Sequence, residues 1–192
     1  MRRAVFLDRD GVLIRDVDLL VDWRDCEVFG SVGQALTRLR ERGFHLLVVS
    51  NQSVLARGLL DQGQFAELQS RLVEALTLAG CPPLDAFYYC PHHPKATLPE
   101  YRLECECRKP RPGMLLRAAR EHQIELQASF MVGDRMTDVA AGAAAGCRTV
   151  LVQTGAHLAA PIHTVEPLNP NLRPDHTCAD LAEAADWILE VM

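Results

Sequence analysis

The sequence of 192 residues contains no apolar run that approaches the roughly 20 residues needed to span a bilayer. Its first apolar run is also too short for a signal peptide, so we expect a cytoplasmic protein. Positive charge is scarce, since 20 lysines and arginines face 25 aspartates and glutamates. The formal net charge of −5 argues against a general attraction to nucleic acid or to anionic membranes, and we expect neither as a partner.

Seven cysteines are an odd number, which argues against a complete disulfide framework. In a reducing compartment, short clusters of cysteines indicate a metal site instead. Hydrophobic residues make up 48% of the chain and charged residues 23%, which is the balance of an ordinary globular protein. At this length we expect a single domain over residues 1–192.

Apolar runs and amphipathic stretches alternate along the chain, which predicts an α/β fold with a mostly parallel sheet and right-handed crossovers. Helices are expected between the strands, with Ser31, Asp61 and Asp180 as N-caps. Gln64 lies three residues after Asp61, and this spacing resembles a capping box. The apolar runs predict buried strands at residues 4–7, 44–49, 86–89, 129–132 and 149–152.

Two stretches show no sustained hydrophobic period. Residues 13–29 carry four aspartates and are expected to form a loop over the end of the first strand. Residues 155–177 contain four prolines, so we expect a surface loop in which His157, His163 and His176 are solvated.

Polar side chains follow three of the predicted strands at the point where each strand ends. Asp8 and Asp10 follow the first, Ser50 and Asn51 the second, and Asp134 and Asp138 the fourth. A single D-x-D-G sequence is more often an acidic turn than a catalytic site. Because ligands of open α/β sheets gather outside the carboxyl ends of the strands, three such ends together predict a site for phosphate or metal.

These residues resemble the haloacid dehalogenase superfamily of phosphotransferases, whose four motifs occur here in order. The motifs are Asp8-Arg9-Asp10-Gly11, Ser50, Lys109 and Gly133-Asp134-x-x-x-Asp138. The resemblance covers nearly the whole chain. It implies a three-layer sandwich around a mostly parallel Rossmann-like sheet, without a large cap domain.

The resemblance also implies roles for the motif residues. Asp8 would be the nucleophile that forms an aspartyl-phosphate. Asp10 would protonate the leaving oxygen and then deprotonate the water that hydrolyses this intermediate. Ser50 and Lys109 would bind the oxygens of the phosphoryl group, because phosphoryl transfer depends mostly on positioning and charge neutralisation.

A catalytic Mg²⁺ is implied as well, because a carboxylate attacks phosphorus only if cations offset the repulsion. Its ligands would be Asp8, the carbonyl of Asp10 and Asp134, with the backbone of Arg135 as a further candidate. Asp138 would lie outside the ligands and orient Lys109 or a metal-bound water.

A second cluster points to zinc. Cys90, His92, Cys105 and Cys107 supply three thiols and an imidazole, which is a sufficient set for a closed tetrahedral zinc site. The alternatives are cysteines placed by chance or a strained disulfide within C-x-C, and His93 could compete with His92. We expect a structural Zn²⁺ that holds the polar loop 90–107, since this loop has little core of its own.

Within the superfamily, the zinc loop and the segment 51–58 resemble the heptose 1,7-bisphosphate 7-phosphatase family. The resemblance implies a small phosphorylated sugar as substrate and a monomer. Residues 16–19 and Val54 depart from the pattern of that family, which leaves the sugar itself open. The implied substrate contacts are Asp16, Asn51, Gln52, Ser53, Arg57, Arg108 and Arg135.

Three other functions compete with this interpretation. Histidinol-phosphate phosphatases share the zinc loop, but tend to have a shorter loop between the ligand pairs and to lack the Ala-Arg-Gly that follows Asn51-Gln52 here. A non-catalytic binding module held by zinc would be expected to lose Asp8 or Asp10, and both are present. A nucleic-acid 3′-phosphatase is disfavoured by the acidic chain.

Overall fold

Six parallel strands form the sheet of this computed structural model, which describes residues 2–155 and 168–192. The strand order is β3-β2-β1-β4-β5-β6, and every neighbouring pair is parallel. Chain order reverses between β1 and β4, which is where open α/β sheets bind their ligands. The strands are β1 (Ala4–Leu7), β2 (His45–Asn51), β3 (Ala86–Cys90), β4 (Phe130–Gly133), β5 (Arg148–Val152) and β6 (His176–Cys178).

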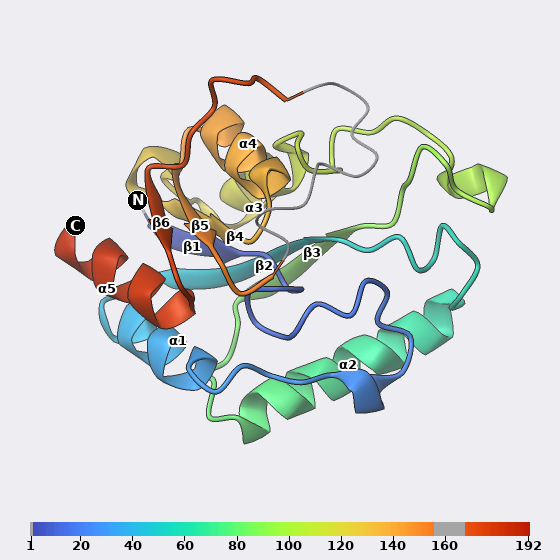
Figure 1. The fold of residues 1–192 in the computed structure, drawn as a ribbon, viewed down its shortest axis with the longest axis horizontal. Helices are drawn as coiled ribbons and strands as arrows, with labels where there is room; N and C mark the ends of the chain where they lie inside the picture. The colour runs from blue at the N-terminus through green and yellow to red at the C-terminus, as the bar shows by residue number, and fades with distance from the viewer. Residues whose placement is uncertain (1, 156–167) are drawn as a thin grey trace.

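Helices cover both faces of this sheet and confirm the expected three layers (Figure 1). One face carries α1 (Val32–Glu41), α2 (Gln62–Leu78) and α5 (Leu181–Glu190). The other carries α3 (Gly113–His122) and α4 (Met136–Ala145). Three short 3-10 helices, η1 (Trp23–Asp25), η2 (Pro99–Tyr101) and η3 (Leu126–Ala128), lie in the connections.

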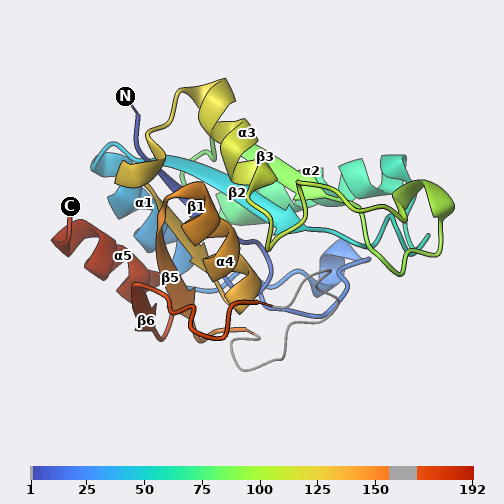
Figure 2. The same ribbon diagram turned by 90° about the horizontal axis from the view of Figure 1, so that it is seen from above.

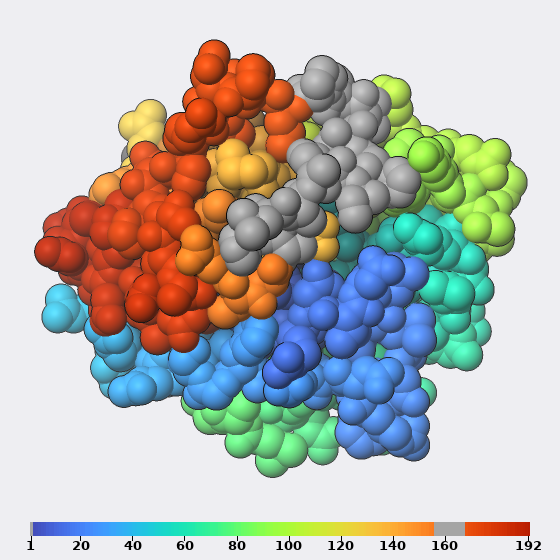
Figure 3. Space-filling model, viewed as in Figure 1, coloured from blue at the N-terminus to red at the C-terminus, as the bar shows by residue number. Residues whose placement is uncertain are grey.

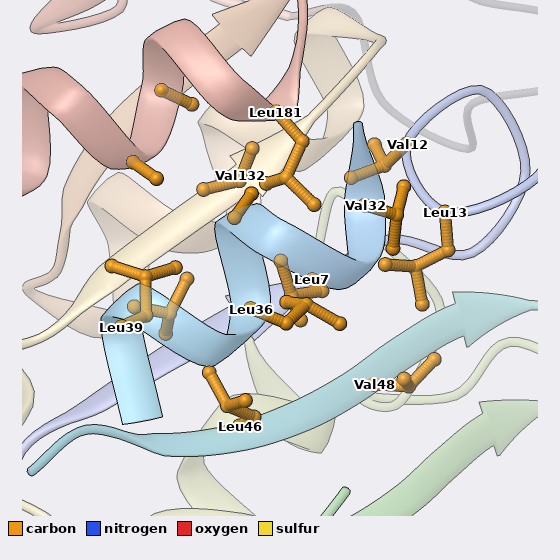
Figure 4. Close-up of a cluster of buried hydrophobic side chains, with 14 of the residues drawn as sticks. Leu7, Val12, Leu13, Val32, Leu36, Leu39, Leu46, Val48, Val132 and Leu181 are labelled. Atoms are coloured by element: carbon orange, nitrogen blue, oxygen red, sulfur yellow. The ribbon is translucent and has the colours of Figure 1, made fainter. Parts of the chain in front are cut away.

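The core divides at the sheet because successive strand residues point to opposite faces. In β1, Val5 and Leu7 join the cluster under α1, α2 and α5, part of which is shown in Figure 4. Ala4 and Phe6 join the cluster under α3 and α4. All four are fully buried. The continuous apolar run of β1 is therefore the signature of a strand covered on both sides.

Helix starts agree with the expected caps at two of three positions. Asp61 and Gln64 form the capping box of α2, and Asp180 accepts hydrogen bonds from Ala182 and Glu183 in α5. Ser31 precedes α1 but makes no capping hydrogen bond. Its hydroxyl instead donates to the second oxygen of Asp180 at 3.0 Å, which ties the starts of the two helices together.

The expectation of a loop over residues 155–177 was wrong at its end, where β6 adds a sixth strand. A strand of three residues is too short to show a period in the sequence. His176 is not simply solvated, because its ring stacks on Trp187 of α5 at 4.8 Å between centroids. His157 and His163 lie outside the described residues.

Two irregular segments reach the pocket edge of the sheet. Residues 13–29 form the expected loop, which lies on the surface beside α2 (Figure 3), where Arg71 lies 5.7 Å from the ring of Trp23. Residues 91–112 extend from the carboxyl end of β3 and return to α3 (Figure 2). In the described part of the chain, no helix is long and apolar enough to cross a membrane.

The contact between α4 and the sheet can be tested with Gly142→Ala. A Cβ at this position would lie 2.6 Å from Cβ of Met131 and 2.8 Å from Cγ2 of Thr149. Overpacking of this kind costs about 1–3 kcal/mol, which exceeds the roughly 1 kcal/mol that alanine gains over glycine in a helix. We expect a net loss of unfolding free energy, measured by urea denaturation.

The matched control is Gly63→Ala, the same change in the exposed first turn of α2. The nearest atom there is Oδ1 of Asp61 at 3.3 Å, and a shift of a few tenths of an ångström relieves this contact while keeping the capping hydrogen bond to Gln64. We expect this variant to be unchanged or stabilised by up to about 1 kcal/mol. Equal effects at the two positions would contradict the proposed close contact.

Candidate active site

The side chains that follow β1, β2 and β4 meet at one pocket of about 130 Å³ at the carboxyl edge of the sheet. Two residues implied by the sequence, Gln52 and Asp134, are buried and do not line this pocket. The others implied for catalysis or substrate binding do line it, namely Asp8, Asp10, Asp16, Ser50, Asn51, Ser53, Arg57, Arg108, Lys109, Arg135 and Asp138.

Lys109 is the buried cation of the pocket. Its Nζ lies 3.0 Å from Oδ1 of Asp8 and 2.6 Å from Oδ1 of Asp138, and it donates to the carbonyl of Val49 at 2.8 Å. Burial by itself lowers the pKa of Lys109, but the attraction of Asp138 and Asp8 outweighs it and raises that pKa. Burial raises the pKa of Asp138 to about 6, although Lys109 opposes this.

Asp10 faces a different set of donors. Arg9 donates to both oxygens of this carboxylate at 2.8–3.0 Å, and Nε2 of Gln52 donates to Oδ2 at 2.9 Å. The same Gln52 nitrogen lies 2.7 Å from the hydroxyl of Ser50. Burial raises the pKa of Asp10 above its ordinary range, and Arg9 opposes the rise. An elevated pKa is what a general acid at neutral pH needs.

Asp134 is completely buried, and backbone packs directly against it. Gly11 has φ of +76°, and a Cβ there would lie 2.5 Å from Oδ2 of Asp134. A Cβ at Gly133 would overlap the side chain of Asp138. The glycines of the D-x-D-G and G-D-x-x-x-D sequences therefore leave room for the carboxylates.

Asn51 uses its side chain to hold Lys109 in place. The amide of Asn51 donates to the carbonyl of Lys109 at 3.0 Å and accepts from its backbone N–H at 3.1 Å. The implied role of Asn51 in substrate contact is therefore joined by a positioning role. Nothing in the sequence motif distinguishes these two roles.

The rim of the pocket is cationic. Arg135 donates to Oδ2 of Asp16 at 2.9 Å, so these two implied substrate contacts are paired with each other. Arg108 is half-buried and donates to the carbonyl of His92 at 2.8 Å, and Arg57 is exposed.

The carbonyl of Arg135 accepts from two amides in the first turn of α4, so we leave it out of the proposed metal ligands.

Sequence reasoning missed two residues at this site. The D-x-D-G motif gives Arg9 no role of its own, although a fully buried arginine is rare. His93 lines the pocket and its Nδ1 accepts from the backbone of Lys95 at 3.0 Å. The sequence motifs suggest no role for His93 other than competition with His92 for zinc.

The four expected zinc ligands lie together at the carboxyl end of β3. The thiols of Cys90, Cys105 and Cys107 and Nδ1 of His92 have measured separations of 3.1–3.7 Å. A zinc tetrahedron with bonds of about 2.3 Å has edges of about 3.8 Å, so the cluster fits this metal. The hydrogen bond between Cys90 and Cys107 lowers the pKa of Cys107 to about 5 and raises that of Cys90, so Cys107 is the thiol that most readily becomes the thiolate needed for binding.

The carboxylate cluster fits a hard divalent cation. Asp8, Asp134 and Asp138 can bring one oxygen each within 4.8 Å of the others. Counting Asp10 as well, four carboxylates face the buried cations Lys109 and Arg9, which leaves a formal charge of −2. Magnesium prefers such oxygen ligands and brings the matching charge.

Comparisons with known proteins agree on one family. A family model described as HAD-hydrolase-like matches residues 106–184. The D-glycero-beta-D-manno-heptose-1,7-bisphosphate 7-phosphatase of Photorhabdus laumondii is 42% identical over 96% of this chain and 96% of its own. The enzyme of the same name from Escherichia coli K12 is 39% identical over 97% of this chain and 87% of its own.

Solved structures give the same result. The D,D-heptose 1,7-bisphosphate phosphatase from B. bronchiseptica, crystallised with magnesium and phosphate, matches with a TM-score of 0.80. It is 32% identical, and the match covers 99% of each chain. An L-2-haloacid dehalogenase with a TM-score of 0.61 and 14% identity shares the fold alone.

The charge balance of the carboxylate cluster predicts a pH dependence without added metal. Burial raises the pKa of Asp138 in the native state to about 6, from an ordinary pKa of 3.8. The native state therefore binds more protons than the unfolded state in this window, and the free energy of unfolding falls as pH rises through it. We expect wild type to lose about 1–3 kcal/mol more than Asp138→Asn between pH 4 and pH 7.

Urea denaturation in buffer without Mg²⁺ measures both slopes. Asp186→Asn is the control, since this carboxylate pairs with Arg38 on the surface and is 62% exposed. The change of its unfolding free energy with pH should match that of wild type. The predicted electrostatics fail if Asp138→Asn and wild type lose stability equally across this pH range.

Proposed function

Because the chain belongs to the D-glycero-beta-D-manno-heptose-1,7-bisphosphate 7-phosphatase family of HAD-like hydrolases, we propose that it hydrolyses the 7-phosphate of D-glycero-D-manno-heptose 1,7-bisphosphate. The reaction is that of a phosphoric monoester hydrolase in nucleotide-heptose biosynthesis. The observation that carries the proposal is the contact of Asp8 with Lys109, which joins a nucleophile to a phosphate-binding cation in one pocket.

Asp8 attacks phosphorus and forms the aspartyl-phosphate. The Lys109 ammonium and the Arg9 backbone N–H both contact Oδ1 of Asp8 and so orient its carboxylate. Lys109 and the Ser50 hydroxyl bind the transferring oxygens. Asp8, Asp134 and the carbonyl of Asp10 would hold Mg²⁺, which when bound would supply charge neutralisation at these oxygens.

Asp10 moves the protons. Its carboxyl group protonates the leaving oxygen of the sugar as the phosphorus–oxygen bond breaks. The resulting carboxylate takes a proton from the water that then attacks the aspartyl-phosphate, and phosphate leaves. Oδ1 of Asp138 lies 2.6 Å from Nζ of Lys109 and so holds this ammonium beside Asp8. Asp138 takes no part in either proton transfer.

The distal part of the sugar bisphosphate lies at the cationic rim. Arg108 offers a planar fork for the second phosphate, and Arg57 adds charge at the entrance. Asp16 and Arg135 separate from each other to contact sugar hydroxyls, and Ser53 completes the phosphate side. Gln52 acts from outside the pocket lining, because its side chain bridges Ser50 and Asp10 and its backbone N–H donates to the carbonyl of Cys90.

We propose a structural zinc at Cys90, His92, Cys105 and Cys107. All four ligands come from the protein, so no position is open for a substrate. Arg108 and Lys109 directly follow Cys107, and the zinc therefore fixes the cations of the pocket. All seven cysteines are thiols, which suits the reducing cytoplasm.

The function is tested by phosphate release from the α and β anomers of the heptose 1,7-bisphosphate and from histidinol phosphate. We expect kcat/KM for one heptose anomer to exceed that for histidinol phosphate by at least about 100-fold. Asp8→Asn should lower kcat at least about 1,000-fold and leave the fold intact by circular dichroism. A higher kcat/KM for histidinol phosphate would show that the proposed heptose substrate is wrong. Turnover by Asp8→Asn would exclude the aspartyl-phosphate mechanism.

The zinc site is tested with Cys105→Ser. Elemental analysis of wild type purified without chelator should give about one zinc per chain. The variant should lose most of this zinc and at least about 2 kcal/mol of stability, equivalent to about 4–8 °C in Tm. Cys26→Ser, which changes a half-buried thiol outside the cluster, should retain full zinc. Zinc-free wild type would contradict the assignment.

A further inference from the structure

Arg9 is a buried charge between the two aspartates of the D-x-D motif. Its residue is only 2% exposed, and it is among the largest fully buried side chains. A guanidinium removed from water is costly unless its partners are well placed. Charges of this kind are seldom retained for stability alone, and they concentrate at functional sites.

The partners of Arg9 are the two catalytic aspartates themselves. Nε and Nη2 form a fork on the Asp10 carboxylate at 3.0, 2.8 and 2.9 Å. The backbone N–H of Arg9 donates to Oδ1 of Asp8 at 2.7 Å. Within the described residues, the side-chain hydrogen bonds of Arg9 all go to Asp10.

Gln52 completes the shell around Asp10 from the neighbouring strand. Its backbone N–H is fixed to the carbonyl of Cys90 at 2.8 Å, so the side chain starts from a rigid position. Nε2 then donates to Oδ2 of Asp10 at 2.9 Å and lies 2.7 Å from the Ser50 hydroxyl. Donors that follow the ends of two neighbouring strands therefore hold Asp10 in a single orientation.

We infer that Arg9 is a positioning residue, which with Gln52 fixes the Asp10 carboxyl group at the leaving oxygen and then at the attacking water. This inference rests on the proposed phosphatase function. Asp10 gives its proton to the sugar oxygen as the phosphorus–oxygen bond breaks. It then takes a proton from the water that forms the new bond to phosphorus. Arg9 itself does not line the pocket.

A loss of orientation affects substrates unequally. A sugar alkoxide is a poor leaving group and needs the proton of Asp10, whereas p-nitrophenolate departs without one. The first chemical step with p-nitrophenyl phosphate is therefore insensitive to Asp10. The second step still needs Asp10 as base, so the aspartyl-phosphate should accumulate with this substrate.

The experiment compares Arg9→Met with wild type on both substrates. We expect kcat/KM for the heptose bisphosphate to fall about 100-fold and kcat/KM for p-nitrophenyl phosphate to fall less than about 5-fold. A burst of p-nitrophenolate should precede a slower steady state in the variant. Equal losses on both substrates, or no loss on either, would overturn the inference.

Arg15→Met is the matched control. Arg15 makes the same kind of fork, on Glu27 at 2.8 and 2.9 Å, but both side chains are about 60% exposed and lie away from the pocket. This variant should match wild type on both substrates. A drop as large as that of Arg9→Met would assign the effect to the loop rather than to Asp10.

Arg9→Lys decides the matter if Arg9→Met does not fold. The ammonium keeps the buried charge but cannot form a two-nitrogen fork, so we expect the heptose activity to fall at least about 10-fold relative to p-nitrophenyl phosphate. If the ratio of heptose activity to p-nitrophenyl phosphate activity in this variant equals that of wild type, positioning of Asp10 by the two-nitrogen fork is excluded. If wild type releases no phosphate from heptose bisphosphate but acts on another sugar phosphate, the proposed substrate fails and the comparison is made on that sugar.

Discussion

The site depends on a buried ammonium that is held between carboxylates. Lys109 is 3% exposed and keeps its charge because Asp8 and Asp138 replace the lost water at 3.0 and 2.6 Å. With Asp10 and Asp134, the carboxylates carry more negative charge than the buried cations balance. Protons or a divalent cation must supply the difference. A phosphoryl group enters the same place with further negative charge, so charge balance links metal binding to substrate binding.

Three features of the fold hold Lys109 in place. Its Nζ is bound to the carbonyl of Val49, and the Asn51 amide holds both backbone groups of Lys109. Cys107, a ligand of the proposed zinc, lies two residues before it. Lys109 belongs to an irregular segment, which alone would place its side chain poorly. Strand β2 and the thiol cluster together give that segment the rigidity of a regular element.

Much of this arrangement could be predicted, because strong local signals were present. The apolar run of β1, the capping box at Asp61 and the thiol spacing each depend on neighbours in sequence. What could not be predicted depends on distant partners. Ser31 leaves its helix for Asp180, 149 residues away, and Gln52 turns inward to Asp10, 42 residues away. Residue type and spacing carry no information on which of two nearby acceptors a polar side chain will choose.

The two parts of the pocket differ in how strictly they specify a ligand. The groups assigned to chemistry are buried and hydrogen-bonded from several strands, so their geometry is fixed before a substrate arrives. The rim is built from long side chains, and Arg57 there is exposed. Arg135 and Asp16 are satisfied by each other, and in the proposed function they must separate to take a sugar. The contacts of such a substrate must offset the loss of the Arg135–Asp16 ion pair. This requirement favours sugars with hydroxyls placed for both side chains and disfavours simple phosphate esters.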